Sequence, residues 1–202
     1  MKKIFKLTLA VAAVLCSSVA VAQTQQGNLM VGGDLSSFNL NFLGGGNGTN
    51  FDMSITPKIA YFIKDGLALG GYANFGLSTQ KGEGSDITYG IGALGRYFLE
   101  DKNVRKMEFS KRSRFFVEAN VGFGGVNYAG PGASTNGLDI GAGPGIAYFI
   151  TPNVALEALL KYNLTVGFGS ATTSNRLGLN VGFQVYLPTA RARELIREET
   201  GK

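Results

Sequence analysis

The sequence FDMSITPKIAYFI at residues 51–63 alternates between apolar and polar side chains with a period of two. One face carries Ile59 among other apolar residues, whereas the opposite face carries Asp52 and Lys58. Successive side chains of a β-strand point to opposite faces of its sheet. The pattern therefore predicts a strand with one apolar face and one polar face.

An internal repeat links this segment to a second one, because PKIAYFI at residues 57–63 is matched by PGIAYFI at residues 144–150. Three turn residues follow each copy, at 64–66 and at 151–153, before the alternation resumes. The repeat indicates β-hairpins that meet the same surroundings twice in the fold.

The same alternation extends through almost the whole chain after residue 22. In its first segment the phase slips near Ser36 and Ser37, which predicts a β-bulge. Each segment is about 12 residues long, and little sequence is left for helices. The alternation therefore predicts eight strands, at roughly 28–42, 51–63, 67–78, 87–99, 114–126, 138–150, 154–169 and 176–187.

The composition excludes several kinds of functional site. The 202 residues include no His, which excludes Ser–His nucleophiles and His-ligated metals. Cys16 is the only cysteine, so neither an intramolecular disulfide nor a Cys-based zinc site is possible. The Gly-x-Gly sequences lie within predicted strands and do not resemble phosphate-binding loops. We therefore expect no enzyme, no catalytic residues, no metal and no cofactor.

Residues 1–22 have the features of a cleaved secretory signal peptide. Three lysines precede an apolar stretch of about 15 residues, which ends in AVA at 20–22. A transmembrane anchor is the alternative, but a spanning helix needs about 20 residues. Removal of this segment lowers the net charge from +5 to +2, which gives no support for nucleic-acid binding. The predicted organisation is a signal peptide at 1–22, a barrel at 23–187 and a short tail at 188–202.

Periodicity alone does not say whether the apolar face points into the barrel or out of it. Four features favour lipid on the outside: export, strands longer than the 9–11 residues that cross a bilayer, charges on the Gly-rich face, and aromatic strand ends. The aromatic residues are Tyr61, Tyr97 and Tyr148, on the apolar face where an interfacial belt would lie. We predict an all-β, eight-stranded antiparallel up-and-down transmembrane β-barrel. A soluble lipocalin-like binder is the minor alternative.

The chain resembles the outer-membrane protein β-barrel domain family, the small eight-stranded barrels of Gram-negative bacteria. The resemblance covers about 28–187 and is carried by the signal ending at Ala22, the two PxIAYFI hairpins and the closing strand LGLNVGFQVYL at 177–187. It implies location in the cell outer membrane, contact with outer-membrane lipid and both termini in the periplasm. The chain differs from the family pattern by the tail that follows its closing strand. The implied outer loops are 43–50, 80–86, 127–137 and 171–175, and the inner turns are 64–66, 100–113 and 151–153.

Several charged residues share the phase of the polar face near the predicted periplasmic end. Arg96 and Glu118 flank the same hairpin and make the best predicted pair, so loss of Arg96 should leave Glu118 unpaired. Glu157 and Lys161 are about 13 Å apart along one strand and need partners on other strands. We interpret the charges as a structural plug, with a gate or ion-selective constriction as the alternative. The predicted lumen network comprises Lys58, Arg96, Glu118, Glu157 and Lys161, with Asp34 as a further candidate.

The sequence therefore favours a monomeric structural or surface-interaction barrel with a filled lumen. The alternative is a narrow pore or transport protein for small or hydrophobic solutes. The basic stretch at 102–114 is interpreted as a solvated loop, with contact to anionic lipid or to a periplasmic partner as the alternative. No surface ligand or periplasmic partner can be named from these residues.

Overall fold

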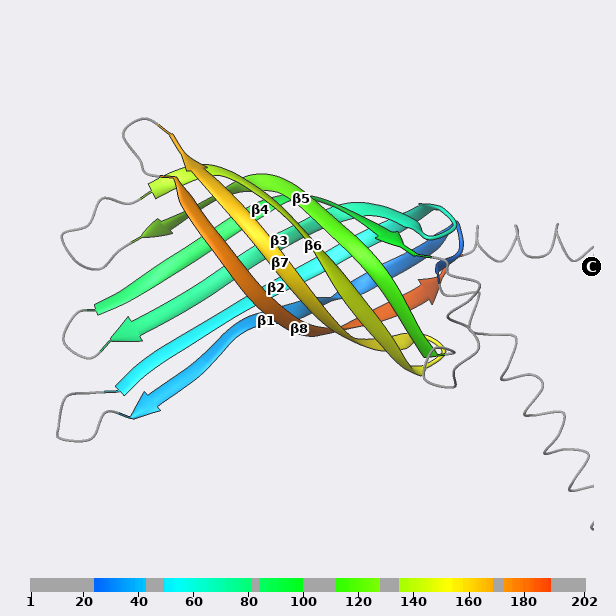
Figure 1. Ribbon diagram of the computed structural model, residues 1–202, viewed down its shortest axis with the longest axis horizontal. Helices are drawn as coiled ribbons and strands as arrows, with labels where there is room; N and C mark the ends of the chain where they lie inside the picture. The colour runs from blue at the N-terminus through cyan, green and yellow to red at the C-terminus, as the bar shows by residue number, and fades with distance from the viewer. Residues whose placement is uncertain are drawn as a thin grey trace, which may run out of the picture.

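A computed structural model describes residues 24–42, 49–80, 84–99, 112–127, 135–168 and 173–189, which form a closed antiparallel β-barrel (Figure 1). Each strand pairs with its sequence neighbours, and the last strand pairs with the first, which closes the sheet. This arrangement confirms the predicted all-β up-and-down topology. The strands are β1 (Asn28–Phe42), β2 (Thr49–Lys64), β3 (Leu67–Gln80), β4 (Gly84–Phe98), β5 (Ser113–Asn127), β6 (Thr135–Thr151), β7 (Val154–Gly167) and β8 (Ser174–Pro188).

Most strands are longer than the alternation predicted, whereas β1 has the predicted bounds and β7 is two residues shorter. They run from 14 residues in β3 to 17 in β6, compared with the expected length of about 12. Pairing of β3 with β4 continues to Gln80 and Gly84, so the predicted outer loop at 80–86 is mostly strand. Backbone hydrogen bonds of a hairpin do not depend on side-chain hydrophobicity, and pairing therefore extends into polar sequence that the alternation does not mark.

The hydrogen-bond ladder has register shifts of two kinds, and the sequence predicted the first of them. The register of β1 against β2 shifts between Leu35 and Ser37, which confirms the predicted bulge. The two copies of the repeat share a second kind of shift, between Phe62 and Lys64 in β2 and at the equivalent place in β6. Gly66, in the turn that follows the first copy, has a φ of 73°, a conformation that glycine adopts without strain.

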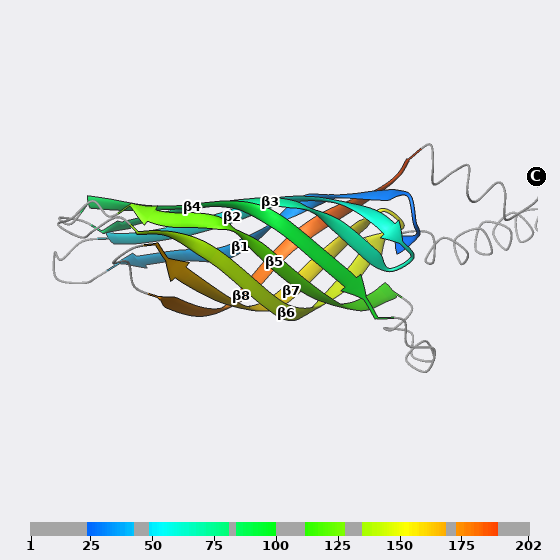
Figure 2. The ribbon, with the colours of Figure 1, turned by 90° about the horizontal axis from the view of Figure 1, so that it is seen from above.

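One end of the barrel carries both ends of the sheet. Asn28 at the start of β1 pairs with Pro188 at the end of β8, beside the short β2–β3 and β6–β7 turns (Figure 2). We call this the inner end, and the opposite end the outer end. The predicted signal peptide and nearly all of the predicted tail lie outside the described residues, as does most of the 100–113 connection. Their assignments stay predictions.

Most large apolar side chains face outward, and the charged side chains of the strand interiors face the lumen. Ile91 and Phe123 on the outer surface are 68% and 61% exposed, whereas Lys58, Glu118 and other charged inward residues are buried. A soluble barrel would show the reverse arrangement. Within the described part of the chain, no helix has the length and apolar character needed to cross a membrane.

Candidate functional site

Arg96 and Glu118 face each other across the β4–β5 pair, deep in the inner half of the lumen. Both side chains are 0% exposed. Arg96 Nη2 donates to Glu118 Oε2 at 2.7 Å, and Arg96 Nε donates to the same oxygen at 3.2 Å. The structure therefore pairs the two residues that the sequence placed on opposite sides of one hairpin.

Two lysines also form ion pairs with Glu118, through its other carboxylate oxygen. Lys58 Nζ in β2 lies 2.7 Å from Glu118 Oε1, and Lys161 Nζ in β7 lies 3.3 Å from it. Lys58 Nζ also lies 2.5 Å from Asp34 Oδ2 in β1. Glu118 therefore has three cationic partners, and the expectation that loss of Arg96 alone would leave it unpaired is wrong.

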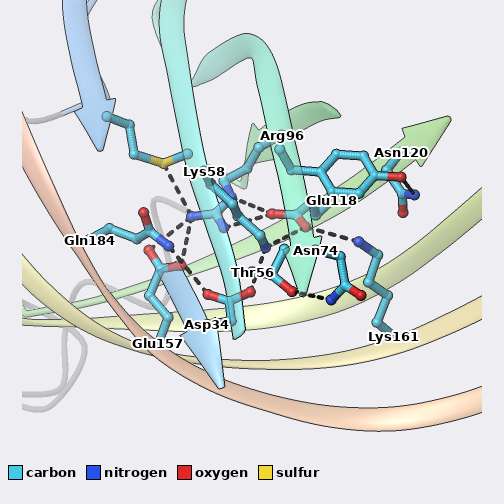
Figure 3. A network of polar contacts seen from close by, with 12 residues as sticks. Asp34, Thr56, Lys58, Asn74, Arg96, Glu118, Asn120, Glu157, Lys161 and Gln184 are labelled. Atoms are coloured by element: carbon cyan, nitrogen blue, oxygen red, sulfur yellow. Dashed lines mark hydrogen bonds and ion pairs between the residues drawn. The ribbon is translucent and has the colours of Figure 1, made fainter. Parts of the chain in front are cut away.

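Glu157, in contrast to Glu118, forms its ion pair with Arg96 alone among the described residues. Arg96 Nη1 donates to both carboxylate oxygens of Glu157, at 2.8 and 2.7 Å, and Tyr186 donates to Glu157 Oε1 at 2.8 Å. Glu157 and Lys161 thus take partners from other strands, because four residues along one strand separate them too far to pair. Arg96 joins the two glutamates across the lumen (Figure 3).

All five predicted residues and Asp34 form one cluster, which we call the ion-pair network. It contains three carboxylates and three cations, so its formal charge is zero. Burial of charges costs several kcal/mol per ion unless each has close partners. The short contacts give every member such a partner, and Gln184 Nε2 adds a donor to Asp34 at 3.3 Å.

An aromatic layer lies next to the network on its inner side. The centroid of the Phe116 ring lies 4.1 Å from the guanidinium carbon of Arg96, within the range of cation–π contact. Neighbouring ring centroids in the layer are 5.2 to 6.3 Å apart. A Cβ on Gly145 would overlap the Phe116 ring, so this glycine makes room for the layer. Its members are Phe62, Phe98, Phe116, Phe149 and Tyr186.

The sequence interpretation missed this layer, although a signal was present. Three strands end in an aromatic pair, and the alternation places one ring of each pair outside and the next ring inside. Phe62 shares the phase of Lys58, and Phe98 shares that of Arg96. Both rings could therefore have been assigned to the lumen.

A second polar cluster lies toward the outer end, around Asp139 in β6. Asn120 and Asn163, on the flanking strands, both donate to its carboxylate through their amide nitrogens. Tyr72 and Thr165 donate to it through their hydroxyl groups. The sequence placed Asp139 on the polar face but gave it no role.

The described residues contain no group of three or more His, Cys, Asp or Glu side chains that could hold a metal ion. Glu118 and Glu157 are held in ion pairs by Arg96. The geometry is therefore suited to filling and fixing the lumen.

Comparison with known proteins identifies the fold. No family model and no curated protein matches the chain. Among solved structures, Neisserial surface protein A is 17% identical, with a TM-score of 0.52, and the match covers 81% of this chain and 100% of that one. The N-terminal β-barrel domain of Pseudomonas aeruginosa OprF is 14% identical, with a TM-score of 0.51 and coverage of 80% and 98%. The chain has the fold of the small eight-stranded outer-membrane barrels.

Proposed function

We propose that this chain is a non-conducting outer-membrane barrel, which is anchored by its apolar surface and makes its functional contacts at its outer end. The fold supports the location. The reversed distribution of apolar and polar side chains supports it further, because lipid is the solvent that favours an apolar exterior.

The strand dimensions also support a spanning barrel. The shortest strands, such as β3, have 14 residues. At about 3.3 Å per residue and a tilt of about 40°, such a strand rises about 35 Å along the barrel axis. This exceeds the hydrocarbon thickness of about 30 Å. The barrel is therefore long enough to cross the bilayer with both ends in water.

The observation that carries the non-conducting assignment is the filled inner half of the lumen. The ion-pair network and the aromatic layer lie in succession across the barrel, and their side chains are almost completely buried. Eight strands enclose a lumen that side chains alone can fill. We therefore assign the network and the layer together as a structural plug.

Planar-bilayer recording tests the plug. The wild-type protein is expected to show no steady single-channel conductance, because ions would have to pass a neutral, fully paired network and a layer of rings. Arg96→Ala should give measurable openings, since it removes the side chain that joins two glutamates. Phe75→Ala is the matched control, because Phe75 faces outward, and it should stay silent. A stable conductance in the wild type would contradict the plug and favour a pore.

Cell fractionation tests the location. The protein should sediment with outer membranes, and the unboiled sample should migrate differently from the boiled sample in SDS gels. The reason is that a closed barrel pairs its strands all round and resists detergent unfolding without heat. A freely soluble periplasmic protein without a boiling-dependent shift would end the membrane proposal.

A second candidate function is passage of hydrophobic solutes along the barrel wall. One observation favours it: an apolar pocket of about 410 Å³ lies on the outward side of β3–β6, toward the outer end. Uptake of a hydrophobic dye into vesicles, faster with the protein than without it, would support this function. The lining of the apolar pocket includes Phe75, Tyr89, Ile91, Phe123 and Phe168.

A further inference from the structure

The lumen differs between its inner and outer halves. Inward-facing side chains are buried around the ion-pair network, whereas Asp139, Asn163 and Thr165 further out are partly exposed. Water therefore reaches the inward-facing wall on the outer side of the network. We call this part of the wall the outer lumen, and the network forms its floor.

The outer lumen carries an excess of negative charge. The described charged residues that share the inward phase there are Asp52, Asp86, Asp139 and Arg176. Their formal sum is −2, in contrast to the neutral network beneath them. A narrow, low-dielectric passage with an excess of one sign of charge concentrates counter-ions. The outer lumen should therefore attract cations from the outer side.

Asp139 is the deepest of these carboxylates. No cation lies within ion-pair distance of it among the described residues, whereas Asp34, Glu118 and Glu157 each have at least one. Only neutral groups donate to it: Asn120 Nδ2 at 2.9 Å, Tyr72 OH at 3.2 Å, Thr165 Oγ1 at 3.3 Å and Asn163 Nδ2 at 3.4 Å. Asp139 is therefore solvated by neutral donors, and Lys161, which pairs directly with Glu118, interacts with its charge only at longer range.

Two amide oxygens near Asp139 accept no hydrogen bond from the described residues. Asn120, Gly141 and Asn163 lie in register on β5, β6 and β7. Oδ1 of both asparagines is buried without a hydrogen-bond partner in the described part of the chain, and Asn120 is only 5% exposed. A Cβ on Gly141 would overlap both oxygens, so they converge on the space above this glycine.

Asp139 holds the two amides in this orientation. Both amide nitrogens donate to its carboxylate, and that of Asn120 also donates to the Tyr72 hydroxyl, which turns both oxygens toward Gly141. A hydrogen bond to a carboxylate polarises the amide and makes its oxygen a stronger acceptor. Rotation of either amide would bring an oxygen against the Asp139 carboxylate. The cluster therefore has a carboxylate without an ion-pair partner and two acceptors without donors. A group with a positive charge and at least two donors would satisfy all three.

We propose that the outer lumen binds a primary ammonium group between the Asn120 and Asn163 oxygens, with Asp139 as its counter-charge. Because both oxygens are buried, the two side chains must move apart to admit the group. An ammonium group carries one positive charge and three N–H donors, which match this deficit. Lys161 cannot serve both sites at once, because its Nζ is directed to Glu118. The lumen of an eight-stranded barrel is narrow, which favours a linear alkylamine.

Isothermal titration of the purified protein in detergent with 1,4-diaminobutane tests this site at constant ionic strength. The wild type should bind the diamine. Asp139→Asn should bind about tenfold more weakly, because it removes the counter-charge. Asp52→Asn is the matched control: it removes one inward-facing charge away from the proposed site, and its affinity should change less than about threefold.

A second variant guards against misfolding of Asp139→Asn. Asn163→Ala keeps the Asp139 charge and removes one of the two oxygens, and it should also weaken binding severalfold. Boiling-dependent gel mobility checks that each variant forms the barrel.

Four results would overturn the proposal. The first is a wild type that does not bind the diamine, and the second is equal binding of tetramethylammonium, which has no N–H donor. The others are tighter binding of Ca²⁺ than of the diamine, and equal affinities for Asp139→Asn and Asp52→Asn. The inference uses the proposed plug only as the floor of the outer lumen. Conductance of the wild type would overturn the plug, whereas a wild type that does not bind the diamine would overturn only the ammonium site.

Discussion

Arg96→Ala is expected to lower the free energy of unfolding by about 3–5 kcal/mol, the cost of removing one partner from a buried ion pair. The main cause is Glu157, which accepts both of its short ion-pair contacts from Arg96 and retains only the Tyr186 hydroxyl afterwards. Glu118 suffers less, because Lys58 and Lys161 still pair with it. Phe116 also loses the guanidinium that lies over its ring.

Double variants identify which carboxylate causes the loss. Unfolding in urea, followed in lipid vesicles by gel mobility, gives the free energies for a double-mutant cycle. Glu157→Gln in the Arg96→Ala background should recover a substantial part of the stability, since it removes the unpaired charge. Glu118→Gln in the same background should recover less, because it deprives two lysines of a partner. Equal recovery by both variants would contradict the assigned partners.

The alternation of the sequence was sufficient to predict the strands and which residues share a face, whereas export, strand length, the charges and the aromatic strand ends were needed to decide which face is outside. Lipid and lumen impose opposite requirements on successive residues, so the phase of each segment is fixed over its whole length. The strand ends were less visible, as at Gln80 and Gly84, because backbone pairing continues where the side chains become uniformly polar. The bulge near Ser36 was visible because it breaks the phase.

Pairing within the lumen was only partly predictable. Arg96 and Glu118 belong to one hairpin, so their distances from its turn indicated that they would lie opposite each other. Arg96 and Glu157 belong to β4 and β7, and their contact depends on how the closed barrel staggers its strands. No local pattern carries that information. The three cationic partners of Glu118 therefore emerged only in the folded barrel.

The cluster around Asp139 was hidden for a different reason. It depends on Gly141, whose missing side chain lets Asn120 and Asn163 lean toward each other over the strand between them. Glycine is frequent on the inward face, so no single glycine marks a site. The register across three strands is what distinguishes this one.

Ile140→Arg tests which solvent surrounds the barrel. Ile140 is the sixth of the 17 residues of β6, within the strand and away from both of its ends, and it faces outward with an exposure of 44%. An arginine on the lipid face at the bilayer midplane costs about 2–4 kcal/mol, because its charge must leave water or distort the bilayer. We expect a loss of this size in the free energy of unfolding, measured in lipid vesicles with urea.

Ile150→Arg is the matched control for depth. Ile150 lies on the same strand with the same phase and a similar exposure of 48%, but it is next to the inner turn. An arginine there reaches the interface, and the cost should fall to about 0–1 kcal/mol. The difference between the two variants isolates immersion in hydrocarbon, because the residue change and the face are identical. Equal costs at both positions would mean that water surrounds the whole barrel, and the outer-membrane proposal would then fail.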